Sequence, residues 1–527
     1  MHNGVYSVYR QPPRRKKSRK WLIAVAAVAA AGAGAFMLLR PSPAERAANS
    51  LGFDASVIET EKTKITGAIK AQAKSYDGNS TASVTTALMH NNAALVLAAY
   101  VPVTDVYSVR QSITKAELPK LQVSIVPEAE AVIKEAAAAA LGLSSLPANQ
   151  KPLAELGSND VVFIPISQLS SDVKLLSLEG AYYLDSYNQG ALFRIASFSG
   201  TAAESLSTLD LNDLKGKDGI LKVNQSGVTA LTRLMQRKLA AVKDPKYFSA
   251  KIGSFMSDAD ITHVSNEVSF RDGCQYSNGL FCSPPEFIET LKDSGVDLVE
   301  ITGNHNNDNG STYNTESIKL YQGLGWNVFG GGLNSNEARK PYVADIKGTK
   351  AAFIGYNMAD GAGSGAIAGT TTAGANIYAR DKAKADIEAA KQAGQFVIVD
   401  IQYAECQAYP AGYTEFPACD GPIGGQEQNF KEMIDLGADM VVGSSAHQPQ
   451  TYELYKGKAI YYGLGNMYFD QTQWPGTERG IILTHYFDSG KLLQTKLSPT
   501  VYDASLQTRL MDAEEAGYLL TRLQQAR

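Results

Sequence analysis

The chain of 527 residues is poor in the side chains that bind soft metals, with only six His and four Cys. A cysteine-rich zinc array, a series of iron–sulfur clusters or a multi-haem relay needs more thiolates and imidazoles than this. Metal chemistry here would therefore rest on carboxylates, amides and one or two imidazoles. With 44% apolar and 19% charged residues, the chain can still bury a large core, which excludes fibrous and wholly disordered classes.

Excess basic charge is also missing from most of the chain. Residues 1–40 contain eight Lys and Arg and no acidic residue, so the remainder holds 41 basic against 53 acidic side chains. An acidic body is a poor surface for nucleic acid, and we expect no nucleic-acid partner. The Gly330-Gly331-Gly332 run lacks the Lys and Ser or Thr of a phosphate-binding P-loop.

A basic leader precedes the longest apolar run. Residues 1–20 are basic and residues 21–39 are uncharged and apolar. A helix of this length, at about 1.5 Å per residue, can cross a hydrocarbon core of roughly 30 Å. The sequence predicts a single-pass cell-membrane anchor with a cytoplasmic tail at 1–20 and an extracytoplasmic body. The alternative is a signal peptide cleaved near Ala33-Gly34-Ala35, which would release a secreted body.

A linker at 40–50 leads into a region that mixes strand-like runs with helices. Between 51 and 220, apolar runs at 94–103 and 161–166 flank an alanine-rich helix at 128–141. This pattern predicts a smaller α/β domain. Its Lys174–Gly180 stretch (KLLSLEG) resembles a phrase of periplasmic-binding-protein-like domains, which implies a ligand cleft.

The pattern from 221 to 503 is more regular. Short β-rich runs end in Gly, Asn or His, and each is followed by a helical stretch. The runs are 297–303, 351–357, 396–402, 439–445 and 459–465. Strands alternating with helices predict an α/β sheet, and such folds build their sites just beyond the strand ends. The tail at 504–527 is expected to be an amphipathic C-terminal helix.

The four cysteines form two local pairs along the chain. Cys274 and Cys282 are eight residues apart, and Cys406 and Cys419 are thirteen apart. Two local disulfides are the simplest pairing in an oxidising compartment. The alternative, a four-cysteine zinc site, is typical of closer pairs than these.

Polar groups follow three of the predicted strands. Asn304, His305 and Asp308 offer an amide oxygen that can bind a hard metal ion and an imidazole that can donate a proton. The alternative is an Asn-rich turn that caps a helix. Asn266-Glu267 places a carboxylate at a second strand end, where it is either a metal ligand or an ordinary exposed Glu. His447 follows a third strand, and a lone His is more often structural.

Two long segments at 293–341 and 433–470 carry a family resemblance. They resemble the CapA family of bacterial capsule and poly-γ-glutamate synthesis proteins, which is related to calcineurin-like metallophosphoesterases. The resemblance spans about 225–472 of the chain. It implies a four-layer α/β/β/α metallophosphoesterase-like domain, here preceded by a smaller α/β domain and a transmembrane helix. It also implies a role beside an envelope polymer and its synthesis machinery.

The resemblance assigns roles to individual residues. It implies metal ligation by Glu267, Asn304 and His447, with His305 as proton donor. Three implied ligands are replaced: an Asp by Val228, a His by Gln402 and another His by Ser445. The further site candidates are Asn266, Asp308, Gln402, Glu405, Ser445 and Asn466.

These replacements predict a weakened metal site. A two-metal centre needs roughly seven protein ligands around ions about 4 Å apart. Even the loss of an outer partner costs about 10- to 100-fold in metal affinity or activity, so losing three direct ligands should disable at least one position. We expect at most one divalent ion, Mn²⁺ or Zn²⁺, in a component of polymer synthesis or export. The alternatives are an active metal-dependent hydrolase (a phosphoesterase or an amide or ester hydrolase) and a two-domain solute-binding receptor.

Overall fold

The computed structural model describes residues 43–72, 82–89, 95–201, 203–206, 209, 211, 217–275, 279–406 and 421–527. The predicted membrane anchor and its basic flank lie outside these ranges. Within them, no helix combines the length and the apolar character needed to cross a membrane. Contacts between residues divide the chain into two compact units: Met1–Ala87 with Ala196–Leu211, and Leu88–Ile195 with Asn212–Arg527.

The first unit contains a parallel pair of strands, β1 (Leu51–Phe53) and β2 (Ala82–Met89). Ile65 and Ile69 lie one turn apart on α3 (Glu59–Gln72) and are fully buried, which makes this face of the helix part of the core. Its described part also contains two short helices, α2 (Pro43–Asn49) and α6 (Ala203–Leu206), and the last residues of β9 (Leu192–Ser199).

Residues 88–195 of the second unit form a mixed sheet. β3 (Leu95–Asp105) pairs antiparallel with β6 (Asp160–Pro165) and β7 (Val173–Leu175), and β6 pairs in parallel with β5 (Gln122–Ile125). The predicted alanine-rich helix is α4 (Ala131–Leu141), and it ends on a glycine in the left-handed conformation. The remaining elements are β4 (Ser112–Ile113), β8 (Ser177–Leu178), β9 (Leu192–Ser199), α5 (Tyr183–Ser186) and the 3-10 turns Leu118–Lys120, Leu153–Glu155 and Ile166–Gln168.

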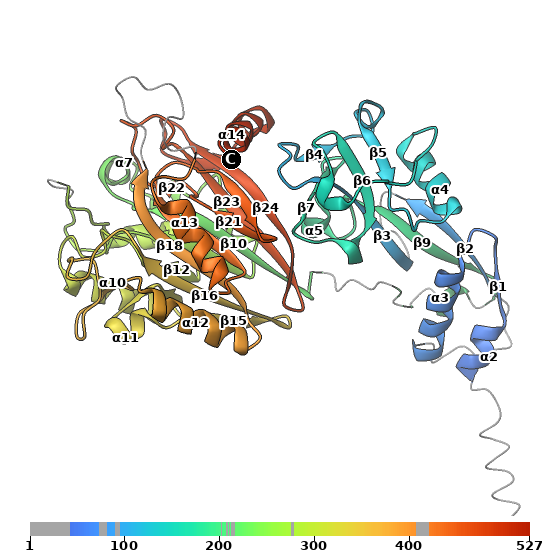
Figure 1. Ribbon diagram of the computed structural model, residues 1–527, viewed down its shortest axis with the longest axis horizontal. Coiled ribbons are helices and arrows are strands. Elements are labelled where there is room, and N and C mark those ends of the chain that lie inside the picture. Colours follow the sequence, from blue (N-terminus) through green and yellow to red (C-terminus); the bar gives the residue numbers. More distant parts are fainter. Residues whose placement is uncertain are drawn as a thin grey trace, which may run out of the picture. The chain divides into compact units, whose positions relative to one another are not determined.

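Residues 212–527 contain two large sheets (Figure 1). The first has the strand order β13-β12-β11-β10-β23-β24-β25, with β22 beside β10. Strands β10 to β13 run parallel, and β23 lies antiparallel to β10. The strands are β10 (Ile220–Thr229), β11 (Ile261–Asn266), β12 (Leu298–Glu300), β13 (Asn327–Phe329), β22 (Asn466–Tyr468), β23 (Arg479–Asp488), β24 (Lys491–Tyr502) and β25 (Thr508–Leu510).

The second large sheet has the order β15-β16-β18-β19-β21-β20, and β16, β18, β19 and β21 run parallel. Its strands are β15 (Tyr342–Ile346), β16 (Thr349–Asn357), β18 (Phe396–Cys406), β19 (Met440–Ala446), β20 (Tyr452–Tyr455) and β21 (Lys458–Tyr461). Each of the five predicted β-rich runs contains a strand, although the run at 459–465 is a strand only as far as Tyr461. A separate small pair joins β14 (Gly331–Gly332) to β17 (Gly374–Ala375).

The inner faces of the two large sheets share one apolar core. Ile261 and Leu298 of the first sheet pack in the same cluster as Ile398 and Met440 of the second. Because side chains alternate along a strand, the same faces continue at positions an even number of residues further on, and these are polar. We call this set the buried polar layer: Gln225, His263, Glu300, Asp400, Ser444 and His485.

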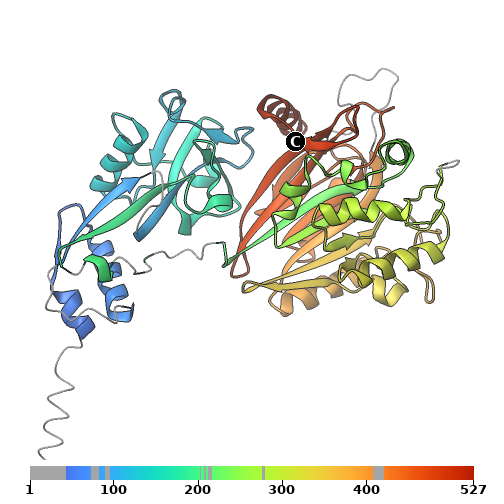
Figure 2. The same cartoon turned by 180° about the vertical axis from the view of Figure 1, so that it is seen from behind.

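Helices cover the outer faces of both sheets (Figure 2). Met235, Leu291 and Ile318 from three helices pack against Val264 and Val299 of the first sheet. On the second sheet, α12 and α13 bury their apolar faces in a corresponding cluster. The helices of this part are α7 (Arg233–Val242), α8 (Gly253–Ser257), α9 (Ile288–Asp293), α10 (Ser311–Gly323), α11 (Ser335–Ala338), α12 (Arg380–Gln392), α13 (Gln426–Asp435) and α14 (Ala513–Gln525), with 3-10 turns at Pro245–Tyr247 and Pro285–Phe287.

The C-terminal helix is shorter than the sequence predicts. Helix α14 begins at Ala513, and β25 precedes it as an edge strand on β24. Asp512 accepts hydrogen bonds from two backbone N–H groups of the first turn, while the Glu515 side chain accepts from the Asp512 backbone. This capping box fixes the start of the helix. The expectation of helix from 504 is therefore wrong up to Asp512.

Candidate functional site

The side chains singled out from the sequence lie where parallel strands of both large sheets end. Glu267 directly follows β11, and Asn304 and His305 lie in the loop after β12. Glu405 is near the end of β18, and His447 directly follows β19. We call these five residues the strand-end group.

His305 is held as a cation between two carboxylates. Its Nδ1 lies 2.9 Å from Asp308 Oδ2, and its Nε2 lies 3.6 Å from Glu405 Oε1. Burial alone would lower the pKa of His305, but the two carboxylates outweigh burial and raise this pKa to about 10. The hydrogen bond from His305 in turn lowers the pKa of Glu405 to about 2. At neutral pH, His305 therefore carries both ring protons and can donate one.

A tight turn positions His305. The N–H of Asp308 donates to the His305 carbonyl (3.2 Å), and the N–H of Gly310 donates to the Asn307 carbonyl (2.8 Å). Gly310 has a φ of +100°, which a side chain would disfavour, and α10 begins at the next residue. The segment is thus a turn before a helix and also the support of His305, so the two interpretations of the sequence are compatible.

A chain of amide and hydroxyl groups joins the strand-end group to the buried polar layer. Asn304 donates to Glu405 Oε1 (3.3 Å) and accepts from Gln402 Nε2 (3.2 Å). Ser444 Oγ lies 3.3 Å from Gln402 Oε1 and 3.1 Å from Glu300 Oε1. Gln402 stands where the resemblance implies a histidine ligand, and its amide is instead committed to this chain.

His447 is a neutral imidazole with an assigned tautomer. Its Nδ1 lies 3.0 Å from Asn466 Oδ1, and Asn466 Nδ2 donates to Gln471 Oε1 (3.1 Å) and to the Thr477 carbonyl (3.0 Å). Because the Asn466 nitrogen uses both hydrogens there, His447 Nδ1 must carry the proton and Nε2 keeps its lone pair. Burial lowers the pKa of His447 to about 4. This neutral form is the one that binds metal ions.

Glu267 is buried with one oxygen unpaired. Its side chain is 1% exposed, and Oε1 has no hydrogen-bond partner among the described residues. Burial raises the pKa of Glu267 to about 7, against the opposing charge of His305. Such a carboxyl can bind a cation or exchange a proton near neutral pH. The alternative of an ordinary exposed Glu is therefore wrong.

Asn266, next to Glu267, has structural partners. Its Oδ1 accepts from Thr229 Oγ1 (2.9 Å), and its Nδ2 donates to the Val268 carbonyl (2.7 Å) and to the Tyr321 hydroxyl (2.8 Å). Both amide hydrogens are used inside the fold. Asn266 therefore fixes the end of β11 and does not present its side chain to a ligand.

The position of the implied metal-binding aspartate is apolar. Val228 is fully buried and packs with Ala230, Val268 and Phe469. The backbone beside it is equally closed, because a Cβ on Gly227 would lie 2.0 Å from a neighbouring carbonyl oxygen. This part of the site is filled by hydrocarbon and offers no ligand.

Ser445 replaces an implied histidine and is unusual in two ways. Its φ of +69° lies in the left-handed region, where non-glycine residues are uncommon, and its buried Oγ has no hydrogen-bond partner among the described residues. With Val228, Gln402 and Ser445 at three ligand positions, and Glu405 paired with His305, the donors do not fit two ions. Glu267 and His447 leave donors for one ion at most.

A disulfide-closed loop covers His305. Cys274 and Cys282 are bonded, as the sequence predicts. The ring of Phe281 lies edge-on to the His305 ring at 4.6 Å, and the Phe281 N–H donates to Asp308 Oδ2 (2.8 Å). The loop thus shares a carboxylate with His305. The second predicted disulfide involves Cys419, which lies outside the described residues.

A second group of ionisable side chains lies in the buried polar layer, and none of its members is among the site residues predicted from the sequence. His263 of β11, Glu300 of β12 and Asp400 of β18 bring ligand atoms within 4.8 Å of one another. The signal was in the sequence, since Glu300 and Asp400 interrupt otherwise apolar strands. Charged residues inside such strands are rarely buried without a partner, and this is the pattern that would have found them.

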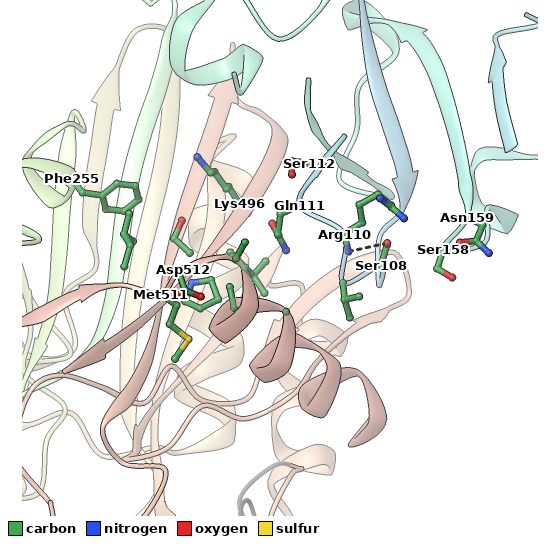
Figure 3. Close-up of a pocket in the computed structure, with 18 residues that line it drawn as sticks. Ser108, Arg110, Gln111, Ser112, Ser158, Asn159, Phe255, Lys496, Met511 and Asp512 are labelled. Atoms are coloured by element: carbon green, nitrogen blue, oxygen red, sulfur yellow. Dashed lines mark hydrogen bonds between the residues drawn. The ribbon is translucent and has the colours of Figure 1, made fainter. Parts of the chain in front are cut away.

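A surface cavity of about 620 Å³ lies elsewhere in the second unit (Figure 3). Its lining includes Ser108, Arg110, Phe255 and Lys496. It contains no residue of the strand-end group or of the buried polar layer. It therefore does not extend the candidate site.

Comparison with known families identifies one matching region. Residues 222–471 match the family described as bacterial capsule synthesis protein PGA_cap. The matched range contains the whole strand-end group and all of the buried polar layer except His485.

Several curated proteins are similar over the same part of the chain. A capsule biosynthesis protein CapA of Bacillus anthracis is 26% identical over 210 residues, covering 39% of this chain and 48% of that protein. A PGA biosynthesis protein CapA of Bacillus subtilis (strain 168) is 25% identical over 215 residues, covering 41% and 53%. A probable polyglutamine synthesis accessory protein of Mycobacterium tuberculosis is 25% identical over 195 residues, covering 35% and 48%. The chain spans about half the length of these relatives.

Solved structures show only distant likeness. The protein TT1561 of Thermus thermophilus is 8% identical with a TM-score of 0.27, covering 51% of this chain and 99% of that one. The Thermus thermophilus sulfate thiohydrolase SoxB in complex with glycerol is 11% identical with a TM-score of 0.27, covering 49% and 42%. At these TM-scores, neither likeness bears on the function of this chain.

Proposed function

We propose that this chain, which belongs to the CapA family of bacterial capsule synthesis proteins through residues 222–471, acts in the synthesis or export of a capsule or poly-γ-glutamate-type envelope polymer. One observation carries the proposal. The matched range holds a convergent site in which the neighbours Asn304 and His305 both contact the carboxylate of Glu405, about a hundred residues further along the chain.

We infer an extracytoplasmic location from the leader. The basic tail at 1–20 and the apolar run at 21–39 suit a single-pass anchor whose body faces the envelope. The Cys274–Cys282 disulfide suits an oxidising compartment outside the cytoplasm. The partners in this proposal are the membrane, the polymer and its synthesis machinery. Cleavage of the leader would instead give a secreted form with the same site.

In this proposal the strand-end group binds a polymer segment and does not hold a two-metal centre. The protonated His305 and the amide of Asn304 are donors suited to the carboxylates and amide carbonyls of such a chain. The paired sheets with outer helices support a metallophosphoesterase-type architecture for this domain. If one Mn²⁺ or Zn²⁺ binds here, Glu267 and His447 would hold it with Asn304, and it would polarise a bound carbonyl or phosphoryl oxygen.

A second candidate function, hydrolysis of an ester or amide bond in the envelope, is favoured by one specific pair. His305 is protonated at neutral pH, whereas Glu267 has an unpaired oxygen and a pKa of about 7. An acid and a base with separated pKa values are what such a reaction requires. Assays with phosphodiester and poly-γ-glutamate substrates test this function. Turnover that Glu267→Gln abolishes would support the hydrolase.

The proposed function is tested by deleting the gene in its own organism and measuring cell-surface polymer. We expect the polymer to be lost on deletion and restored by the wild-type gene. Complementation with His305→Gln or Glu405→Gln should restore less than about a tenth of the wild-type amount of polymer, because each substitution leaves the charge of the other residue unpaired. Glu388→Gln removes an exposed carboxylate of α12 and is the matched control that should restore polymer fully. Unchanged polymer in the deletion strain would contradict the proposal.

A further inference from the structure

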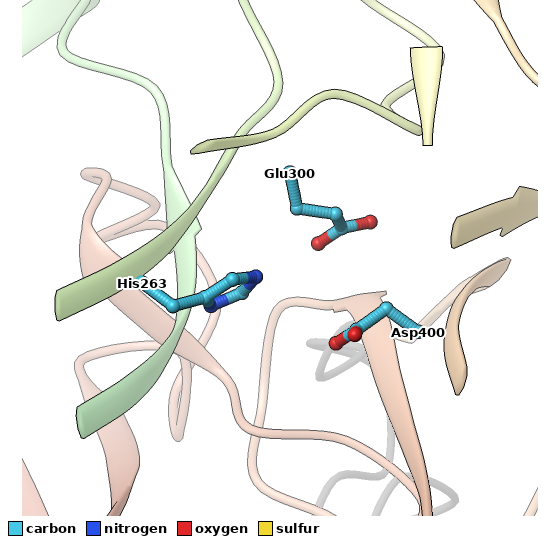
Figure 4. Close-up of side chains that lie close together, drawn as sticks. All are labelled: His263, Glu300 and Asp400. Carbon is cyan, nitrogen blue, oxygen red and sulfur yellow. The ribbon is translucent and has the colours of Figure 1, made fainter. Parts of the chain in front are cut away.

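Three ionisable side chains converge inside the sandwich of sheets. His263 and Glu300 come from neighbouring strands of the first large sheet, and Asp400 comes from the second. Figure 4 shows the three side chains pointing toward one another. Each residue is 1% exposed, so the cluster is closed to solvent. It supplies one imidazole and two carboxylates from three different strands.

Each carboxylate has one oxygen held and the other unpaired. Gln225 Nε2 donates to Asp400 Oδ1, and Thr302 Oγ1 and Ser444 Oγ donate to Glu300 Oε1. Asp400 Oδ2 and Glu300 Oε2 have no hydrogen-bond partner among the described residues. Hydrogen bonds from neighbouring groups to one oxygen orient the other, as in carboxylates that bind metal ions.

His263 is equally exceptional. Neither Nδ1 nor Nε2 has a hydrogen-bond partner among the described residues, and the ring lies against Phe329 (5.5 Å) and Phe353 (6.5 Å), one from each sheet. Buried polar atoms without partners are rare because each costs about 1–3 kcal/mol. Here each of three residues has a buried atom without a hydrogen-bond partner in the described part of the chain, and each brings one ligand atom within 4.8 Å of the other two. That arrangement suits ligands that share a central ion.

The two carboxyl groups of the cluster also favour the binding of a cation. Across the described ranges, no Lys or Arg is among the groups that shift the pKa of Glu300 or Asp400. Burial therefore raises the pKa of both carboxyl groups. A divalent cation would neutralise two carboxylates that otherwise must stay protonated. Burial also lowers the pKa of His263, to about 3, which leaves a neutral imidazole able to bind metal.

We propose that His263, Glu300 and Asp400 bind one divalent first-row transition cation inside the sandwich, at a position separate from the strand-end group. Because the three ligand atoms lie within 4.8 Å of one another, bonds of about 2.0–2.2 Å to a central ion would require each donor to move by less than about 1 Å. One imidazole and two carboxylates favour Zn²⁺ or Mn²⁺ over Ca²⁺ or Cu⁺. The ion ties the two sheets together, because Asp400 is the only one of the three ligands from the second sheet.

The interior ion is linked to the strand-end group. Glu300 Oε1 (3.1 Å) and Gln402 Oε1 (3.3 Å) are alternative acceptors for the single hydroxyl hydrogen of Ser444, and Gln402 donates to Asn304. An ion bound to Glu300 would weaken its hold on this hydrogen and leave it to Gln402, which contacts Asn304. The proposal does not rest on the function in polymer synthesis, since it concerns metal binding alone.

The test measures metal in the purified full-length chain. The protein is loaded with Zn²⁺ or Mn²⁺ in separate preparations, treated with EDTA in the folded state, and analysed by mass spectrometry for metal content. We expect about one retained ion per chain, because the ligands are closed to solvent, and its release once the chain is unfolded in urea. Asp400→Asn and Glu300→Gln should each reduce the retained ion at least tenfold.

The strand-end group provides the matched control. Glu267→Gln and His447→Gln should keep the interior ion. If these two variants lost the ion while Asp400→Asn kept it, the proposal would be overturned. Because an interior variant can fail to fold, Co²⁺-loaded wild-type protein provides a second measurement. Visible absorption bands of Co²⁺ bound to nitrogen and oxygen, unchanged in Glu267→Gln and His447→Gln, are expected. Absence of any retained ion in folded wild-type protein would also overturn the proposal.

Discussion

The strand-end group and the buried polar layer place the same kinds of side chain at different depths. In the strand-end group, His305 lies between two carboxylates and is protonated, so opposite charges meet. In the buried polar layer, His263 is neutral, and the two carboxyl groups near it have no basic side chain paired with them among the described residues. The same residue types therefore act as an ion pair in one place and as an unpaired donor set in the other.

Depth explains the difference. Near the strand ends, some water reaches Glu405, whose side chain is 39% exposed, and an imidazolium is tolerated. Between the sheets, removal from water outweighs attraction, and each group takes its neutral form unless an ion enters. In this protein, the surroundings of a residue decide its role, whereas its type alone does not.

The largest expected effect comes from placing a charge in the apolar part of the strand-end site. Val228→Asp should reduce the free energy of unfolding by about 3 kcal/mol at pH 7, because the carboxylate would lie among Ala230, Val268 and Phe469. Urea unfolding measures this loss of stability, and Val228→Asn is the control, because asparagine is uncharged and has a shape similar to that of aspartate. Equal stability of the two variants at pH 7, or recovery of stability with added Mn²⁺, would show that the site still accepts the missing ligand.

The loop that covers His305 gives the next effect. Replacing both Cys274 and Cys282 by Ser should cost about 2 kcal/mol, the loss expected for opening a loop of this length. Because Phe281 contacts His305, the NMR signals of that ring should shift, whereas those of His263 should not. A reducing agent should lower the free energy of unfolding of the wild-type protein by more than that of the double variant. Shifts at His263 of the same size would contradict the separation of the two regions.

A third prediction concerns the charge of His305. His305→Gln should cost about 1.5 kcal/mol at pH 6, since it removes charged hydrogen bonds to Asp308 and Glu405. The folded pKa is raised from 6.5 to about 10, so this stabilisation is complete below pH 6.5 and is lost as pH rises through 10. The difference between variant and wild type should therefore fade from pH 6.5 to 10. His485→Gln, whose ring is neutral in this range, should give a constant difference.

The smallest expected effect is an increase in stability. In metal-free protein, Asp400→Asn should raise the free energy of unfolding by on the order of 1 kcal/mol at pH 7. Burial raises the pKa of Asp400 in the folded protein above its ordinary value of 3.8. Above pH 3.8 the carboxyl group therefore ionises in the unfolded chain before it does so in the folded protein, and this lowers the free energy of unfolding. At pH 3 the gain should vanish. Urea unfolding at both pH values measures this, and lower stability of the variant at pH 7 would contradict it.

Much of the fold could be predicted from the sequence because strands and helices leave periodic patterns. Each of the five β-rich runs contains a strand, and the Cys274–Cys282 disulfide forms as its spacing predicts. The start of α14 could not be placed by amphipathicity alone. The capping box at Asp512 and the edge strand before it decide where the helix begins.

The candidate site was predictable only in part. The sequence pattern indicates that Asn304 and His447 follow strands. It does not indicate that Glu405 pairs with a protonated His305. Glu267 is buried because the chain after β11 passes under the loop at Gly303, a long-range contact without a local signal. His263 stood apart from every motif, and only the packing of two sheets brings it to Asp400.

The most direct test of the contrast between the two regions is anomalous X-ray diffraction from crystals of zinc-loaded protein, measured on both sides of the zinc edge. We predict one peak, bounded by His263, Glu300 and Asp400, and none between Glu267 and His447. A peak at Glu267 and His447 with none in the interior would contradict it, and so would the absence of any peak from folded, zinc-loaded protein.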